Sequence, residues 1–211
     1  MKIEFVSDVA CPWCAVGLYS LERALARIDP AIAVELHFQP FELNPDMPTE
    51  GEDATEYLSR KYGLTAEQLA QNRRVIVERG AAVGFSFGER SRVWNTFDAH
   101  RLLHWAALQG ASYQRGLKRA LLGAYHGQGE NPGARDVLLR VAGEVGLDVE
   151  AAREVLESGR FADEVRSRQQ HYRQLGINAV PSVIVNDRHL IQGGQPPEVF
   201  EQALRQIAAG G

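Results

Sequence analysis

The segment DVACPWC at residues 8–14 decides how this chain folds. Before it, Lys2–Ser7 has the apolar content of a short buried strand. After it, apolar side chains recur at helical spacing up to Ile28. Pro12 suits the first turn of that helix, because its missing N–H would have no partner inside the helix there. The pattern therefore predicts that Cys11 and Cys14 lie where a strand passes into a helix.

The residues that follow predict a second strand beside the first. Asp29-Pro30 ends the helix, because the residue before a proline is driven out of helical geometry. Residues 33–38 then alternate between apolar and polar side chains, which is the period of a strand. A helix between two strands is the crossover that a parallel pair requires. The first forty residues are thus expected to form strand, helix and strand.

The rest of the chain divides into a helical block and a second sheet-forming segment. The pattern predicts helices at 55–62, 65–83, 95–108, 112–125, 135–145, 150–157 and 161–175. Strands at 180–186 and 189–192 and a closing helix at 197–208 follow. We therefore predict an α/β fold whose main domain comprises residues 1–50 and 176–211. Residues 51–175 are expected to form a large all-helical insertion domain.

Composition excludes several classes of protein. The chain has 211 residues, of which 45% are hydrophobic and 24% charged, as in ordinary globular domains. The net charge is −4 and no basic stripe is present, so nucleic acid is not an expected partner. Glu4, Ser7 and Asp8 interrupt any apolar leader, and no window has the length of a membrane helix. We expect a cytoplasmic protein without a membrane partner; the sequence leaves its oligomeric state open.

Cys11 and Cys14 are the only two cysteines of the chain. In a reducing compartment such a pair is not expected to form a structural disulfide. Residues three apart on a helix are neighbours, so these two can form a disulfide without distorting the backbone. Cys11 at the helix start would have its thiolate stabilised by unpaired N–H groups, which lowers its pKa below about 8.5. Cys14, one turn further on, is predicted to resolve the mixed disulfide that Cys11 forms.

A structural zinc site is the main alternative for these cysteines. Such a site needs a second pair of ligands at suitable spacing. The histidines do not supply a tight pair; they stand at His37, His100, His104, His126, His171 and His189. His100 and His104 share a helix face and come nearest to one. We therefore predict redox chemistry and no metal.

Val180-Pro181 is the second unusual feature, because a proline at the start of a core strand removes a donor from the ladder. A cis peptide bond would explain it, and so would a trans proline that begins an edge strand. From these two residues alone, the trans proline is the simpler reading.

Taken together, these features resemble the DsbA-like thioredoxin family over essentially the whole chain. The branch most similar in pattern is the FrnE-like dithiol–disulfide isomerases. The segments that carry the resemblance are Asp8-x-x-Cys11-Pro12-Trp13-Cys14, Phe41-x-Leu43-Asn44-Pro45, Asn95-Thr96-x-x-Ala99-His100-Arg101 and Val180-Pro181. The resemblance implies a thioredoxin fold, a redox pair at Cys11 and Cys14, and a groove between the two lobes. It also implies a cis bond at Pro181, whose ring would shield the sulfurs, and substrate pairing with the Val180 backbone.

Other residues are expected to support this pair. Pro12 and Trp13 stand between the sulfurs, and Trp13 is the aromatic residue expected to be exposed; Trp94, Phe97 and Trp105 are assigned to the core. Asp8 either caps the helix or accepts a proton from Cys14, with capping the simpler role. His100 either faces the groove or is satisfied by hydrogen bonds within its own helix, which is the simpler reading.

Glutathione-dependent enzymes are the alternative function. Kappa-class glutathione transferases and 2-hydroxychromene-2-carboxylate isomerases are similar in the Val180-Pro181 and insertion segments, but they typically have serine where Cys11 stands. Cys14 therefore favours a thiol–disulfide oxidoreductase or isomerase that acts on a protein or small-molecule disulfide or dithiol. No cofactor is expected to be required. Glutathione is a candidate redox partner, with Val180, Gly194 and Gln195 as its candidate contacts. A non-enzymatic binding module that keeps the fold is the third reading.

Overall fold

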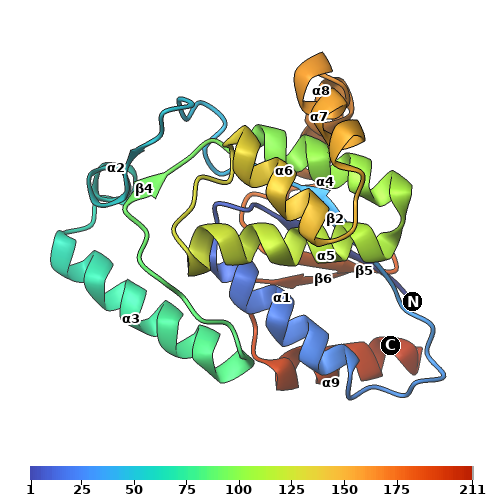
Figure 1. The fold of residues 1–211 in the computed structure, drawn as a ribbon. Helices are drawn as coiled ribbons and strands as arrows, with labels where there is room; N and C mark the ends of the chain where they lie inside the picture. The colour runs from blue at the N-terminus through green and yellow to red at the C-terminus, as the bar shows by residue number, and fades with distance from the viewer. Residues whose placement is uncertain (211) are drawn as a thin grey trace.

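Strand β1 (Lys2–Ser7) is an inner strand of the main sheet of the fold drawn in Figure 1. The computed structural model describes residues 1–210. β1 pairs in parallel with β2 (Glu35–Pro40) and antiparallel with β5 (Ser182–Val185). β5 in turn pairs with β6 (His189–Gln192), which gives a four-stranded sheet of order β2-β1-β5-β6. Residues from the two ends of the chain thus form one sheet, as predicted for a thioredoxin fold.

Helices α1 (Pro12–Leu25) and α9 (Pro197–Ala208) pack on each other and on one face of this sheet. Phe5 points to that face and shares a hydrophobic cluster with Leu18 and Phe200. Val6, the next residue, points to the opposite face and packs with Tyr172. Successive apolar side chains of β1 therefore point to opposite faces of the sheet, and helices pack against both faces.

The insertion lies between β2 and β5 and contributes most of the helices. Its elements are β3 (Glu52–Asp53), α2 (Ala54–Tyr62), α3 (Ala66–Val83), β4 (Arg92–Val93), α4 (Phe97–Gln109), α5 (Ala111–Leu122), the π-helical turn η1 (Gly123–Gly127), α6 (Arg135–Glu144), α7 (Val149–Ser158) and α8 (Ala162–Gln174). None of the helices within residues 1–210 is both long and apolar enough to cross a lipid bilayer.

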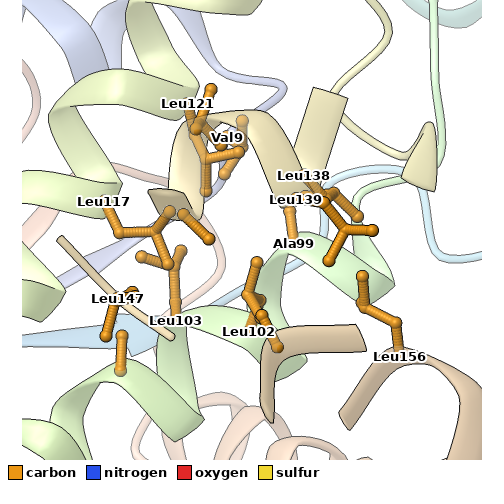
Figure 2. Close-up of a cluster of buried hydrophobic side chains, with 14 of the residues drawn as sticks. Val9, Ala99, Leu102, Leu103, Leu117, Leu121, Leu138, Leu139, Leu147 and Leu156 are labelled. Carbon is orange, nitrogen blue, oxygen red and sulfur yellow. The ribbon is translucent and has the colours of Figure 1, made fainter. Parts of the chain in front are cut away.

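A large apolar core joins helices α4 to α7 (Figure 2). Leu102 of α4, Leu121 of α5 and Leu138 of α6 are fully buried in it. Val9 lies in the same cluster, beside Leu121 in Figure 2. Because Val9 stands two residues before Cys11, the core of the insertion fixes the loop that carries the cysteines.

Residues 54–83, which we call the α2–α3 arm, extend to one side of this core (Figure 1). Thr65 forms the predicted capping box with Gln68 at the start of α3. Within α3 only Gly80 and Val83, near its end, are buried. The arm is therefore anchored by the end of α3 that packs against α1, and most of its length borders solvent or a cleft.

The structure corrects several predicted boundaries. The second strand begins at Glu35 and continues to Pro40, and the strand expected at 180–186 covers only Ser182–Val185. The helix expected at 112–125 changes to π geometry at Gly123. The insertion also contains the short β3–β4 pair, so it is not all-helical. Strands of two residues are too short to carry a detectable period.

Gly88 is a position where the fold tolerates no side chain, which gives a test of the packing between η1 and the segment that follows α3. A Cβ atom at Gly88 would overlap the backbone carbonyl oxygen of Gly127. Gly88→Ala should therefore lower the free energy of unfolding by about 1–3 kcal/mol. Gly123→Ala is the control, since nothing lies within 4 Å of a Cβ atom there. Urea unfolding checks both, and equal midpoints for the two variants would contradict the packing described.

Candidate active site

Cys11 is the N-cap residue of α1 and Cys14 lies one turn into the helix. Pro12 occupies the first turn, as predicted, and the backbone N–H of Cys14 donates to the carbonyl of Cys11 at 3.1 Å. The two cysteines sit 3.6 Å apart and are not joined by a disulfide. Cys11 is 4% exposed and Cys14 is fully buried. Cys11 is therefore the more accessible of the two sulfurs.

Val180 and Pro181 lie directly against this pair, although they are far away in the sequence. The Sγ atom of Cys11 donates to the carbonyl oxygen of Val180 at 3.5 Å. The Val180–Pro181 peptide bond is cis, as the family resemblance implied and against the simpler reading of a trans proline. The ring of Pro181 packs on α1, because a Cβ atom on Gly17 would stand only 2.9 Å from its Cγ.

The two thiols have opposite electrostatic environments. A hydrogen bond from the Cys14 side chain lowers the pKa of Cys11, and the backbone N–H groups of Cys14 and Trp13 add to this against burial and the charge of Asp8. Burial raises the pKa of Cys14 well above its ordinary value, and the neighbouring Cys11 adds to the effect. Cys11 is thus the thiol that ionises first, with Cys14 as a protonated donor beside it.

Asp8 is fully buried just before the cysteines and joins three parts of the chain. Its carboxylate accepts from the N–H of Ala10 at 3.0 Å, the N–H of Leu43 at 2.7 Å and the hydroxyl of Thr96 at 2.8 Å. Burial alone would raise its pKa, but the hydrogen bond and attraction of His100, together with these N–H groups, lower it. Within the described residues no side chain caps α1, so the simpler expectation that Asp8 caps the helix is wrong.

His100 makes a long-range contact instead of a local one. Its Nε2 atom lies 3.3 Å from Oδ1 of Asp8, and the side chain is 2% exposed. The expectation that His100 is satisfied within its own helix is therefore wrong, since its partner stands 92 residues away. It does not line the cleft that contains Cys11 either. Together with Thr96, it ties α4 to the cysteine loop.

Lys118 of α5 was missed by sequence reasoning. It is 1% exposed, which is rare for a lysine, and burial lowers its pKa while the charges of Cys14 and Asp8 oppose this. Its neighbour Arg119 is a partly exposed arginine that forms an ion pair with Glu22, so the local sequence resembles an ordinary solvated helix. Only the packing of α5 against the sheet brings Lys118 inside.

A cleft of about 910 Å³ opens beside Cys11. Pro12, Trp13 and Val180 line one side, together with Cys11. The α2–α3 arm lines the other side with apolar side chains that include Leu58, Leu69 and Ile76. The groove that the resemblance implied is therefore present, and half-buried Trp13 faces it.

The three candidate contacts for glutathione do not share one surface. Val180 lines the cleft, but Gly194 and Gln195 do not. Gly194 lies against the backbone of Trp13, since a Cβ atom there would be 3.0 Å from the Trp13 carbonyl oxygen.

The aromatic residues that were assigned to the core differ in burial. Trp105 is buried in the helical core, whereas Trp94 and Phe97 are half-buried.

Comparisons with known proteins agree on one family. The model of the DSBA-like thioredoxin domain matches residues 2–205. An uncharacterised protein of Bacillus subtilis (strain 168), YwbO, is 29% identical over 205 residues, which is 97% of this chain and 96% of that protein. The crystal structure of a probable DsbA oxidoreductase from Streptomyces coelicolor has a TM-score of 0.90 and 34% identity, covering 98% of this chain and 89% of that one.

Two more distant structures share the fold. A 2-hydroxychromene-2-carboxylate isomerase has a TM-score of 0.72 and 14% identity, over 99% of this chain and 96% of its own. The cytosolic disulfide reductase DsbM from Pseudomonas aeruginosa, solved with GSH, has a TM-score of 0.69 and 15% identity, over 99% of this chain and 100% of its own. At this identity the likeness describes the fold alone.

The opposite environments of the thiols predict how they react with iodoacetamide. In the reduced protein, Cys11 should be alkylated with an inflection below the pH of an ordinary cysteine, because its pKa is lowered, while Cys14 stays unmodified. Cys14→Ala removes the hydrogen bond that contributes most, so the inflection should move to higher pH. Cys14→Ser keeps a donor and should move it less. Mass spectrometry across pH 4–10, roughly the range of protein thiols, checks this; preferential labelling of Cys14 would contradict it.

Asp8 gives a second test of the same electrostatics. Its negative charge raises the pKa of Cys11, so Asp8→Asn should shift the Cys11 inflection to lower pH. The amide keeps the shape of the side chain but loses the charge that attracts His100. The shift is measured by the same alkylation assay. An inflection at higher pH in this variant would show that Asp8 acts on Cys11 through position and not through charge.

Proposed function

This chain belongs to the DsbA-like thioredoxin domain family, and we propose that it is a thiol–disulfide oxidoreductase that exchanges disulfides through Cys11 and Cys14. The observation that carries the proposal is the position of Cys11 at the start of α1, where its sulfur contacts the Val180 carbonyl and its partner lies one turn away. A thiol that is both ionisable and reachable is the nucleophile in such exchange.

The proposed exchange has two steps. The Cys11 thiolate attacks one sulfur of a substrate disulfide, and the other sulfur leaves as a thiolate that takes a proton from solvent. Cys14 then loses its proton and attacks the Cys11 sulfur, so the second substrate sulfur leaves as a thiol. The substrate gains two electrons and the protein ends with a Cys11–Cys14 disulfide. In the reverse direction the oxidised protein donates its disulfide to a dithiol.

Because Cys14 is more deeply buried than Cys11, the two cysteines act in different steps of the proposed exchange. The raised pKa of Cys14 keeps it protonated until the mixed disulfide has formed, which prevents it from competing for substrate. The charge of Lys118 favours the Cys14 thiolate and so assists the second step. Asp8 is a poor proton acceptor, since its pKa is lowered and its oxygens already accept from several donors. We therefore assign Asp8 to holding the loop.

We place the chain in the FrnE-like branch as a dithiol–disulfide isomerase or oxidoreductase that works in the cytoplasm. No cofactor is needed for the exchange, and glutathione is the proposed partner that resets the cysteine pair. The fold shared with DsbM, a cytosolic disulfide reductase solved with GSH, is consistent with this setting.

A glutathione-dependent isomerase, or a transferase of the kappa-class type, is the second candidate. The fold that the chain shares with 2-hydroxychromene-2-carboxylate isomerase favours it. In that case Cys11 alone would act, and Cys14 would be dispensable. The buried contact between the two cysteines makes the oxidoreductase the better supported of the two.

Substituting Cys14 separates the two functions. With dithiothreitol as reductant, the wild type should accelerate the precipitation of reduced insulin. Cys14→Ser should fall to the rate of dithiothreitol alone. When the same reduced variant is mixed with insulin without dithiothreitol, it should accumulate a mixed disulfide on Cys11, because no resolving thiol is then present. Cys11→Ser is the control that should form no mixed disulfide.

Two results would contradict the proposal. Full insulin reduction by Cys14→Ser would remove the need for a resolving thiol, and glutathione conjugation by that variant would favour the transferase. A wild type in which neither thiol is alkylated at neutral pH would indicate a binding module that keeps the fold without the chemistry.

A further inference from the structure

The cleft beside Cys11 has an uneven distribution of charge. Among the residues that line it, the charged side chains are Arg73 and Arg90, and none is a carboxylate. Most of the remaining wall is apolar and comes from the α2–α3 arm. A molecule that fills the cleft therefore meets mostly hydrocarbon on the arm, and positive charge from Arg73 of the arm and from Arg90 beside the cysteine loop.

Arg90 lies beside the loop that carries Cys11. Its Nη1 atom donates to the carbonyl of Ala10, the residue before Cys11, at 3.4 Å. Its guanidinium also lies 5.6 Å from the centre of the Tyr125 ring. The ion pairs formed within residues 1–210 do not include Arg90, although the side chain is half-buried. A guanidinium has five N–H donors, so most of its capacity is left for another acceptor.

Arg73 extends the positive charge along the arm. Its Nη2 atom donates to the carbonyl of Gly88 at 2.6 Å. The carboxylate near it belongs to Glu89, at 3.5 Å, and that side chain is fully exposed. An ion pair with a fully solvated partner contributes little and is easily exchanged. Arg73 is therefore also available to an anion inside the cleft.

We propose that this cleft binds a low-molecular-weight disulfide or thiol that has an apolar body and a carboxylate. The apolar body would contact the arm, the carboxylate would pair with Arg90 and then Arg73, and the sulfur would reach Cys11. The carboxylate and guanidinium match in shape and charge, and a half-buried site strengthens their hydrogen bonds. For its sulfur chemistry this inference rests on the proposed function.

The size of the cleft favours a small molecule as the occupant. Its volume of about 910 Å³ lies within the range of roughly 300–1,000 Å³ that is usual for small-molecule sites. It is walled by the start of α1 and by the arm.

Disulfide exchange with such a small molecule follows the same two steps. One aromatic disulfide and the reduced protein give two aromatic thiols and the Cys11–Cys14 disulfide, which dithiothreitol reduces again.

A binding measurement tests the carboxylate site without any sulfur chemistry. Calorimetric titration of the reduced wild type with 2-naphthoate and with 2-naphthamide compares two ligands of similar size that differ in charge. The carboxylate should bind about tenfold more tightly, as expected for a charge-assisted hydrogen bond. Arg90→Gln should remove this preference. Arg74→Gln is the matched control, because Arg74 is exposed on α3 and outside the cleft.

Turnover of two disulfides then tests the substrate class. Both assays contain dithiothreitol and compare two aromatic disulfides. One of them, 5,5′-dithiobis(2-nitrobenzoate), has carboxylates, and the other, 4,4′-dithiodipyridine, has none. The ratio of their kcat/KM values should fall about tenfold in Arg90→Gln and less in Arg73→Gln. The ratio cancels any effect of Arg90 on the reactivity of Cys11 itself. Arg74→Gln should leave it unchanged.

The outcomes separate this inference from the proposed function. Equal binding of acid and amide by the wild type, or a preference that survives in both arginine variants, overturns the carboxylate site. Selective binding without turnover of either disulfide supports the site and contradicts the oxidoreductase. Reduction of insulin that is faster than that of both aromatic disulfides, and unaffected by Arg90→Gln, overturns the small-molecule substrate in favour of a polypeptide. Circular dichroism confirms that each variant is folded.

Discussion

The site depends on the hydrogen bonds that the buried carboxylate of Asp8 accepts. A charge with no access to water must be matched by several donors, and here they come from its own loop, from Leu43 after β2, and from Thr96 and His100 of the insertion. The same set of bonds therefore joins the sheet-forming half of the chain to the helical half. It does so three residues before Cys11, so the geometry of the cysteines follows from it.

The reactive pair combines contributions from both halves. The sheet domain supplies the helix start that favours a Cys11 thiolate and the Val180–Pro181 loop that lies against its sulfur. The insertion supplies the apolar core around Val9 and the buried Lys118, which act on the position and the charge of the cysteines. Burial of Cys14 then makes the two thiols unequal, and the proposed order of the two exchange steps rests on this inequality.

The α2–α3 arm gives the site its outer wall. Its end packs on α1, while the side chains along it face the cleft with hydrocarbon and with Arg73. The cysteines are thus held by the sheet and α1, and the opposite wall of the cleft is carried by the arm, which packs on α1 through α3 and on β3 and β4 through α2.

The sequence by itself determined the order of the sheet-forming elements along the chain and the helix start at Cys11, because these depend on periods and on spacing within a few residues. It assigned wrong roles to Asp8 and His100 and gave no sign of Lys118 or Arg90. Apart from the N–H of Ala10, the hydrogen-bond partners of the Asp8, His100 and Arg90 side chains stand 35 to 92 residues away. Lys118 is buried by the packing of α5. Only the packing of the insertion on the sheet decided those contacts, since burial and long-range pairing leave no local pattern.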